Sequence, residues 1–382
     1  MLFGIFNKSF LLFFLALLQL NPAIASDKPS LSWAGFAFLG DFDQRDIRYP
    51  YTSEIALESK NQQSSIDKTI FTLVRGFNSE KFQLDTSMAK NSDSLSAGLG
   101  IAYEDIYKIK TGSKYKVSYE IGLNFIVFDF QERKIIAIYP MKFLRNEIYN
   151  KEPTKEDHKK IFKNLYTGNE FNILEKSLKR ISNVQIKEAM GNYLGVSHIE
   201  FTKNSKEDVL NSLEIDSIKT SIAQEFEGLL SVNNQVPLVP YTKGEIIGKD
   251  MAVRFSDRSQ MTFALPDLDY NISILVRGFD FKVTKHHYGY TIKITILASD
   301  DLHPKLVVLN LSKNIWVLKR GSGNIEDESS QWIVYKEALS ILLQELTQQI
   351  NNISKTWLKK HSTNKDATLQ LQNLQKLINK SK

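Results

Sequence analysis

Segments in which polar and apolar residues alternate fall into two blocks, and a helical pattern follows each block. Alternation with a period of two, bounded by polar turns, is typical of β-strands and hairpins. Strand runs followed by helices favour an α+β fold in which mostly antiparallel sheets are packed by amphipathic helices. The predicted strands are residues 115–121, 125–130 and 134–139 in the first block, and 290–296, 305–311 and 314–318 in the second.

The predicted helices show apolar residues at helical spacing. Residues 157–180 form the first helical region, with start signals at Thr154 and Asp157 and a break at Gly168. Residues 330–358 are expected to form one long amphipathic helix whose apolar stripe packs on the second sheet. A further helix, over residues 206–230, would open the second half of the chain.

The pentapeptide LVRGF occurs twice, at residues 73–77 and 275–279, and each copy follows PYT and EI in the same order. This recurrence predicts a tandem duplication of one sheet-plus-helix module, although both copies could also share one sheet. In each copy we expect a strand, an arginine at its exit, a glycine that permits a bend or bulge, and a phenylalanine that returns to the core. The alternative is an arginine aimed at an anionic group. The predicted structural-repeat residues are Arg75, Gly76, Phe77, Arg277, Gly278 and Phe279.

The chain divides into four predicted parts. They are a signal peptide (1–25), a first α+β module (26–200), a second α+β module (201–362) and a flexible, lysine-rich tail (363–382). The tail has only a short apolar strip, and an isolated helix of that length is marginal in water. We therefore expect it to be mobile or loosely docked, or to become ordered on an acidic partner surface or anionic lipid heads.

The N-terminus has the pattern of a secretory signal. Lys8 precedes an apolar run over residues 9–20, and Ala23 and Ala25 stand where a signal peptidase reads small residues. An uncleaved anchor is the alternative. The absence of cysteine excludes a lipidated cysteine and any disulfide framework. We expect export to the periplasm, with no transmembrane segment in the mature chain.

The net charge of +6 is spread over the chain with both signs interspersed, which argues against nucleic acid as a partner. The sequence contains no G-x-G-x-x-G, no phosphate-binding loop and no G-x-S-x-G, so no cofactor and no catalytic residue is predicted. The glycine pair Gly98 and Gly100 is interpreted as a flexible turn.

Four stretches with ligand-like or acid-rich composition are interpreted as turns or loops. Residues 286–288 (HHY) make a poor chelate, because neighbouring residues on a strand point to opposite faces. Residues 40–46 lack the glycine and the closing glutamate of a calcium loop. Residues 266–269 (PDLD) read as a turn. The acids Asp267 and Asp269 of this turn and the adjacent acids Glu104 and Asp105 are the pairs considered for hydrolysis, and no metal site is predicted.

In general make-up, with a signal peptide, duplicated α/β modules and no catalytic constellation, the chain resembles periplasmic accessory proteins of Gram-negative secretion apparatuses, type VI among them. This resemblance implies a non-catalytic scaffold whose partners are other envelope proteins of a membrane-spanning machine. The alternatives are a periplasmic hydrolase of cell-wall or envelope polymers and a solute-binding protein.

Overall fold

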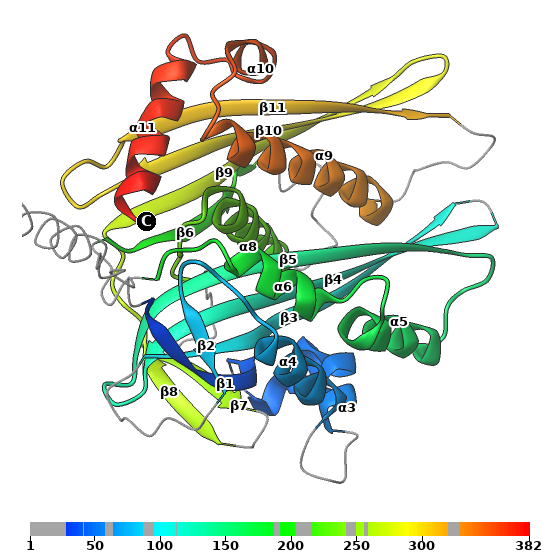
Figure 1. The fold of residues 1–382 in the computed structure, drawn as a ribbon. Coiled ribbons are helices and arrows are strands. Elements are labelled where there is room, and N and C mark those ends of the chain that lie inside the picture. The colour runs from blue at the N-terminus through cyan, green and yellow to red at the C-terminus, as the bar shows by residue number, and fades with distance from the viewer. Residues whose placement is uncertain are drawn as a thin grey trace, which may run out of the picture.

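The computed structural model describes residues 28–40, 42–57, 64–86, 95–111, 113–186, 192–203, 215–241, 250–255, 259–319 and 328–382. The predicted signal peptide lies outside these residues. Two mostly antiparallel sheets and several helices form a layered α+β fold, so the predicted fold class is confirmed (Figure 1). Within the described residues, no helix is long and apolar enough to cross a membrane.

The first sheet has the order β2-β1-β3-β4-β5-β8-β7, and β7 also pairs with β1. That pairing closes six strands into a ring at one end of the sheet, and apolar side chains such as Ala37, Phe128 and Phe263 fill its interior. The strands are β1 (Ser30–Leu39), β2 (Gln83–Asp85), β3 (Ser96–Thr111), β4 (Lys114–Asp129), β5 (Lys134–Tyr149), β7 (Asp250–Phe255) and β8 (Gln260–Ala264).

Helices cover the outer face of the first sheet and enclose a second core. The start signals at Thr154 and Asp157 form a capping box, and the helical region breaks at Gly168 as predicted. A second capping box, Ser64 with Asp67, begins another helix of this layer. The helical elements are η1 (Phe42–Gln44), α2 (Arg45–Arg48), α3 (Pro50–Leu57), α4 (Ser65–Arg75), α5 (Lys155–Thr167) and α6 (Ile173–Ile181).

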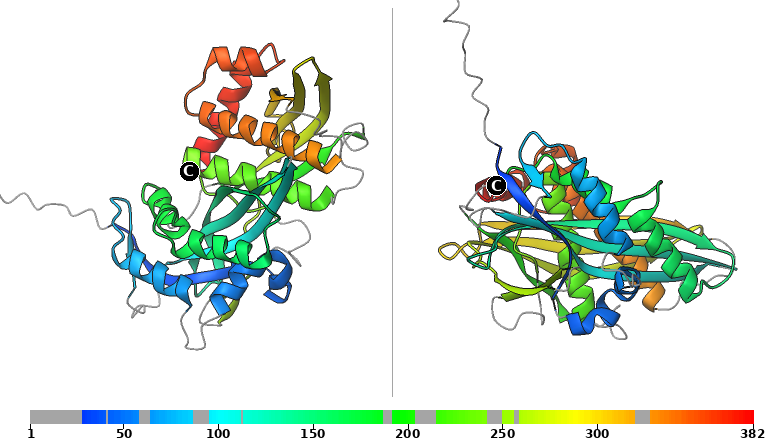
Figure 2. Two further views of the ribbon diagram at one scale, coloured as in Figure 1. Left: turned by 90° about the vertical axis from the view of Figure 1, so that its right-hand side faces the viewer. Right: turned by 60° about the horizontal axis from the view of Figure 1, so that its bottom comes forward.

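The second sheet has the order β11-β10-β9-β6 and forms its core with α8, α9 and α11. Helices α8 and α9 pack side by side between the two sheets (Figure 2). Predicted turn 312–314 lies inside one continuous strand, and predicted helix 330–358 is two helices. The elements are β6 (Leu194–Phe201), α8 (Ile215–Asn234), β9 (Tyr270–Val283), β10 (His287–Ser299), β11 (Val307–Leu318), α9 (Glu328–Gln349), α10 (Lys355–His361) and α11 (Ala367–Lys380).

Both halves use the same order of elements. In each, a strand runs parallel to the first strand of a three-stranded meander: β1 beside β3-β4-β5, and β6 beside β9-β10-β11. Helices lie between the two parallel strands in the chain, because a parallel pair needs a long crossover. Helices also follow each meander. The likeness is one of topology, and it does not extend to the repeated pentapeptide.

The two copies of LVRGF occupy unrelated elements, so their predicted equivalence is wrong. Residues 73–75 form the last turn of α4, and Gly76 is its C-cap residue. Residues 275–279 lie inside β9. A tandem duplication therefore cannot be inferred from this motif.

The side chains of the motif have structural surroundings in both copies. Arg75 lies over the ring of Phe71, 4.5 Å from its centroid. Arg277 is the extra residue of a β-bulge in β9, and its Nη2 donates to the carbonyl oxygen of Ile294 at 3.2 Å. The predicted bulge is thus confirmed for the second copy alone, and it lies at the arginine, next to Gly278. Phe77 and Phe279 both pack against a core, as expected.

The predicted boundary at residue 200 is displaced, because the two modules interlock. Strand β6, which falls at the end of the predicted first module, pairs with β9 in the second sheet. Strands β7 and β8, from the predicted second module, complete the first sheet. The end of β1 takes its antiparallel partner from β7, which lies more than 200 residues later in the chain.

The predicted flexible tail is a docked helix. Leu371, Leu374 and Ile378 of α11 are fully buried in the core of the second sheet. Polar side chains before and within α11 also bind the free edge of β11: Asn364 Oδ1 accepts from the Asn310 amide at 2.7 Å, and Gln370 Oε1 accepts from the Val308 amide at 2.8 Å. The tail therefore closes an otherwise open sheet edge.

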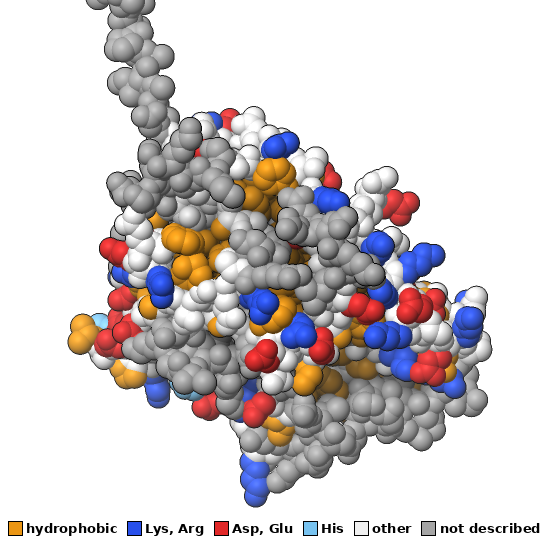
Figure 3. Space-filling model, turned by 90° about the horizontal axis from the view of Figure 1, so that it is seen from below, with side chains coloured by type: hydrophobic (Ala, Val, Ile, Leu, Met, Phe, Trp, Pro, Cys, Tyr) orange, Lys and Arg blue, Asp and Glu red, His pale blue; other side chains and the backbone are white. Residues whose placement is uncertain are grey.

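On the face of the molecule that lies at the bottom of Figure 1, basic and acidic side chains are interspersed (Figure 3).

Candidate functional site

A buried ion network joins the first sheet to the helices between the sheets. Nζ of Lys142 on β5 lies 3.2 Å from Glu120 Oε1 on β4 and 3.1 Å from Glu225 Oε1 on α8. Lys336 on α9 reaches Glu120 Oε2 at 3.4 Å, and Ser340 donates to Glu225 Oε1. All four charged side chains are about nine-tenths buried or more. The network therefore ties α8 and α9 to the first sheet.

Burial and neighbouring charge set the pKa values in this network. Burial lowers the pKa of Lys336, whereas in Lys142 the burial effect is outweighed by Glu225 and Glu120, which raise the pKa of its amine. Burial opposes ionisation of Glu225, but the two lysines hold the pKa of this carboxyl below its usual value. Burial raises the pKa of Asp105, at the edge of the network. Each lysine faces a carboxylate, which is the arrangement of a structural clamp.

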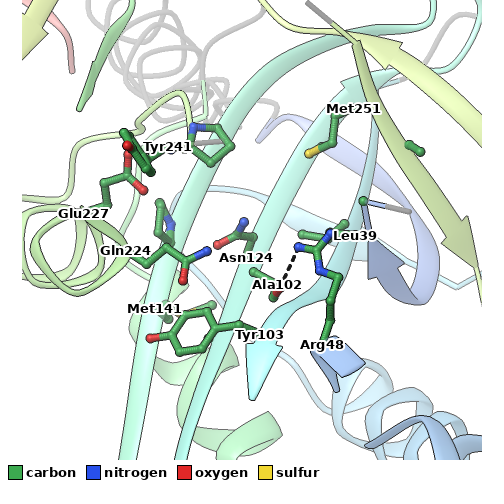
Figure 4. Close-up of a pocket in the computed structure, with 15 residues that line it drawn as sticks. Leu39, Arg48, Ala102, Tyr103, Asn124, Met141, Gln224, Glu227, Tyr241 and Met251 are labelled. Carbon is green, nitrogen blue, oxygen red and sulfur yellow. Dashed lines mark hydrogen bonds between the residues drawn. The ribbon is translucent and has the colours of Figure 1, made fainter. Parts of the chain in front are cut away.

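A pocket lies beside this network, where α8 passes the mouth of the ring (Figure 4). Its empty volume is about 590 Å³, including space open to solvent. A β-bulge at Ala102 frees the carbonyl oxygen of this residue, which accepts from Arg48 Nη2 at 3.2 Å. Gly40, with φ of +83°, makes room for that guanidinium, because a Cβ there would lie 2.1 Å from Arg48 Nη1.

Polar side chains converge on the pocket without hydrogen bonds to one another. Figure 4 shows Tyr103, Asn124 and Gln224 pointing into it, and none of the three makes a side-chain hydrogen bond within the described residues. The Tyr103 ring fits because it crosses Gly122, where a Cβ would lie 2.0 Å from the ring. Glu227 closes one side; burial raises the pKa of its carboxyl well above the usual value, and it accepts from the Tyr241 amide at 2.7 Å. The pocket thus offers neutral donors and acceptors, together with the guanidinium of Arg48, among apolar walls.

The acid pair Glu104 and Asp105 does not form a paired site. The interpretation of this pair as part of a loop is wrong, because the two residues are neighbours on β3 and point to opposite faces. Glu104 caps the N-terminus of α3, where its oxygens accept from the amides of Tyr51 at 2.5 Å and Thr52 at 2.9 Å. Asp105 accepts from the hydroxyl of Tyr107 at 3.2 Å on the other side. The carboxylates therefore serve two separate structural contacts.

The other singled-out stretches are structural. Of the stretch 286–288, His286 lies at the β9–β10 turn, as predicted, whereas His287 and Tyr288 begin β10. Residues 266–269 form the predicted connection, with Asp269 Oδ2 accepting from the Tyr193 amide at 2.7 Å. Gly98 and Gly100 lie inside β3, so their interpretation as a turn is wrong. A Cβ at Gly98 would lie 3.2 Å from the Gly35 carbonyl oxygen, which shows that β1 approaches β3 closely there. In the calcium-like stretch 40–46, Asp41 lies outside the described residues, and residues 42–46 are helical (η1 and the start of α2), so their interpretation as a loop is wrong.

The free ends of both meanders project to the same side of the molecule, past the helices (Figures 1 and 2). The upper blade consists of residues 279–289 and 314–319, and the lower blade of residues 106–111, 113–117 and 144–150. Large apolar side chains of the upper blade are exposed: Phe281 (42%), Val283 (58%), Trp316 (50%) and Leu318 (51%). Leu144 and Ile148 are exposed on the lower blade.

No family model and no curated protein matches the sequence. Among solved structures, the chain is similar to a minor lipoprotein from Acinetobacter baumannii, at 12% identity over 40% of this chain and 91% of that chain. The TM-score is 0.23, so this likeness carries no argument about fold or function.

Neither the ion network nor the blades correspond to a motif in the sequence. A signal for the network was present, since Glu120 and Lys142 each interrupt a long apolar strand. A charge in such a strand needs a partner that is remote in the sequence. A signal for the upper blade was Trp316, an aromatic residue at a polar position of an alternating strand.

Proposed function

We propose that this protein is a non-catalytic accessory protein of the bacterial periplasm, which docks to and supports a cell-envelope assembly such as a secretion apparatus. The observation that supports the proposal is the upper blade. Its exposed apolar side chains lie on both faces of a projecting sheet end. Exposed apolar side chains that gather at one projecting end of a protein are typical of interaction sites.

Both faces of the upper blade carry such residues because the bulge at Arg277 shifts the alternation in β9. Phe281 and Val283 follow Phe279 on the face that continues the core, whereas Trp316 and Leu318 lie on the opposite face of β11. A sheet end that exposes apolar groups on two faces is suited to insertion into a partner surface.

Cell fractionation tests the docking proposal. In the cells that make the protein, we expect recovery with the envelope fraction, and a shift of most of it to the soluble periplasm in the variant Trp316→Ser/Leu318→Ser. The matched control is Leu369→Ser on α11, since Leu369 is 52% exposed and lies away from the blades. Equal recovery of all three proteins in the soluble fraction would refute docking through the blade.

The pocket favours a second candidate function, the binding of a small polar molecule. Unpaired amide and hydroxyl groups in a concave, partly apolar site are typical of ligand pockets. Such a ligand would carry both donors and acceptors to satisfy Tyr103, Asn124 and Gln224. Mass spectrometry of the native protein purified from its own cells would detect a retained small molecule, which Asn124→Leu/Gln224→Leu should lose.

A further inference from the structure

We infer that the upper blade binds an anionic lipid surface, in contact with the headgroups of a bilayer. This inference rests on the proposed envelope function and names the partner of the same blade. The blade combines exposed Trp316, half-buried Tyr288 and apolar neighbours with lysines at the tip. Tryptophan and tyrosine concentrate at membrane–water interfaces, where an apolar ring and a polar edge are both satisfied.

The charge of the upper blade complements such a surface. Lys282 and Lys285 are exposed at the tip, and Lys319 lies with its amine 4.8 Å from the ring centroid of Tyr288. Asp280, the one acidic residue of the blade, is paired with Lys293 at 2.6 Å. Lysines held near an anionic membrane are attracted to its surface.

The backbone groups of the blade that face β10 are hydrogen-bonded. Strand pairing continues to Val283 with Tyr288 on one side of β10 and to His287 with Leu318 on the other. The turn is also closed, because the Thr284 amide donates to the His287 carbonyl oxygen at 2.9 Å. The outer edges of β9 and β11 have no strand partner along the blade within the described residues, so the blade suits the headgroup zone, where water and polar headgroups can bond them.

The lower blade adds a second basic contact on the same side. Between Ile106 and Val117 the sequence has four lysines and no acid, and Ile148 nearby is 71% exposed. Lys110 and Lys114 stand at the tip, on either side of the β3–β4 turn. Two basic, partly apolar ends that project in one direction can meet a single flat surface (Figure 1).

Vesicle flotation tests the inference. The chain used lacks residues 1–25, since their apolar run would itself enter lipid, and every described element lies beyond them. The vesicles are pure phosphatidylcholine, or phosphatidylcholine with about a quarter phosphatidylglycerol, in salt of about 0.05 M or about 0.5 M. We expect binding to the anionic vesicles at low salt, and at least about tenfold weaker binding to neutral vesicles or at high salt.

Two pairs of variants distinguish binding through the upper blade from attraction that depends only on net charge or on any exposed apolar side chain. Lys282→Glu/Lys285→Glu should weaken binding by at least about tenfold, whereas Lys359→Glu/Lys360→Glu, the same charge change on α10, should stay within about twofold. Trp316→Ser/Leu318→Ser should also lose binding, and Leu369→Ser should keep it. Melting temperatures check that each variant is folded, which the exposure of these side chains favours.

The outcomes of these experiments distinguish a lipid surface from a protein surface as the partner of the upper blade. No binding of the unaltered chain, equal binding to both vesicle types, or equal losses on the blade and on α10 would each overturn the inference. If vesicle binding is absent but association with the envelope fraction persists in cells and depends on Trp316, the docking function stands and the partner is a protein surface. If both are absent, the proposed function fails as well.

Discussion

At the scale of single residues, the glycines of LVRGF are not required by the backbone. A Cβ at Gly278 would meet no atom within 4 Å, and at Gly76 the nearest atom is the Leu73 carbonyl oxygen at 3.7 Å. Neither glycine has a φ in the left-handed region. The recurrence of the motif therefore did not identify positions where only glycine fits.

The first prediction compares these glycines with Gly195. We expect Gly76→Ala and Gly278→Ala to change the free energy of unfolding by less than about 1 kcal/mol. Gly195→Ala should lower it by about 1–3 kcal/mol, because the new Cβ would lie 2.7 Å from the Val239 carbonyl oxygen. Urea denaturation measures all three, and a large loss at Gly278 would contradict this account.

The second prediction concerns the pH dependence of stability. Burial raises the pKa of Glu104 to about 7, against the opposing hydrogen bonds from Thr52 and Tyr51. The folded state therefore binds this proton more tightly than the unfolded state, whose carboxyl titrates near 4.5. The contribution of Glu104 is fully present below pH of about 4.5 and is lost as the pH rises to about 7, by up to about 3 kcal/mol.

Glu104→Gln isolates this contribution, since glutamine cannot titrate and keeps an acceptor for the α3 amides. Urea denaturation between pH 5 and 8 should show the stability of the unaltered protein falling relative to the variant as the pH rises. Glu227 also has a raised pKa, but it contributes equally to both proteins and cancels in the comparison. Parallel curves would show that Glu104 does not titrate in this range.

At the scale of elements, α11 is part of the second module. The third prediction is that deletion of residues 363–382 lowers the melting temperature substantially, because it exposes apolar core and leaves the β11 edge unpaired. Leu374→Asp should cost at least about 3 kcal/mol, whereas Leu369→Ser should be nearly neutral. Thermal denaturation measures stability, and size-exclusion chromatography detects edge-to-edge association. An unchanged melting temperature in the deletion variant would contradict the docked tail.

The helices and strands also show which structural features a local sequence pattern can predict. The helix start at Thr154 and the helix break at Gly168 were predicted correctly, because capping and helix-breaking residues act over only a few residues. The docking of α11 was not predicted, since its short apolar strip is stable only against a surface made by distant strands. The turn predicted at residues 312–314 is strand for the same reason: pairing with β10 outweighs the local preference of serine, lysine and asparagine.

At the scale of the whole molecule, the ion network and the exchanged strands join the two modules. The fourth prediction is that Lys142→Met lowers the free energy of unfolding by about 3–5 kcal/mol, because it leaves Glu120 and Glu225 buried with too little positive charge. Adding Glu225→Gln should recover part of that loss, so that the double variant costs less than the two single variants together.

A half-exposed pair provides the control for the network. Lys293→Met removes the ion pair with Asp280, in which the side chains are 43% and 51% exposed, and should cost less than about 1 kcal/mol. Equal losses for Lys142→Met and Lys293→Met in chemical denaturation would show that burial does not set the strength of the network. A single unfolding transition in the unaltered protein is expected, because the modules share strands and charges.

The sequence by itself determined the α+β class, the strands β4, β5, β10 and β11, and the helix start at Thr154. These depend on the spacing of apolar residues and on caps, which are local properties. The sequence alone did not predict the candidate sites. The network and the pocket each combine side chains from elements that are remote in the chain, and the upper blade is exposed only because the helices do not cover the end of its three consecutive strands.

Only the tertiary structure decided what LVRGF becomes. In the first copy, Val74 continues the spacing of Ile66 and Ile70 and is buried on a helix; in the second, Val276 continues the alternation of Ile272 and Ile274 and is buried on a strand. The intrinsic preference of five residues is small beside the burial that the surrounding sheet and helices provide. The same pentapeptide therefore forms a helix end in one core and a bulged strand in the other.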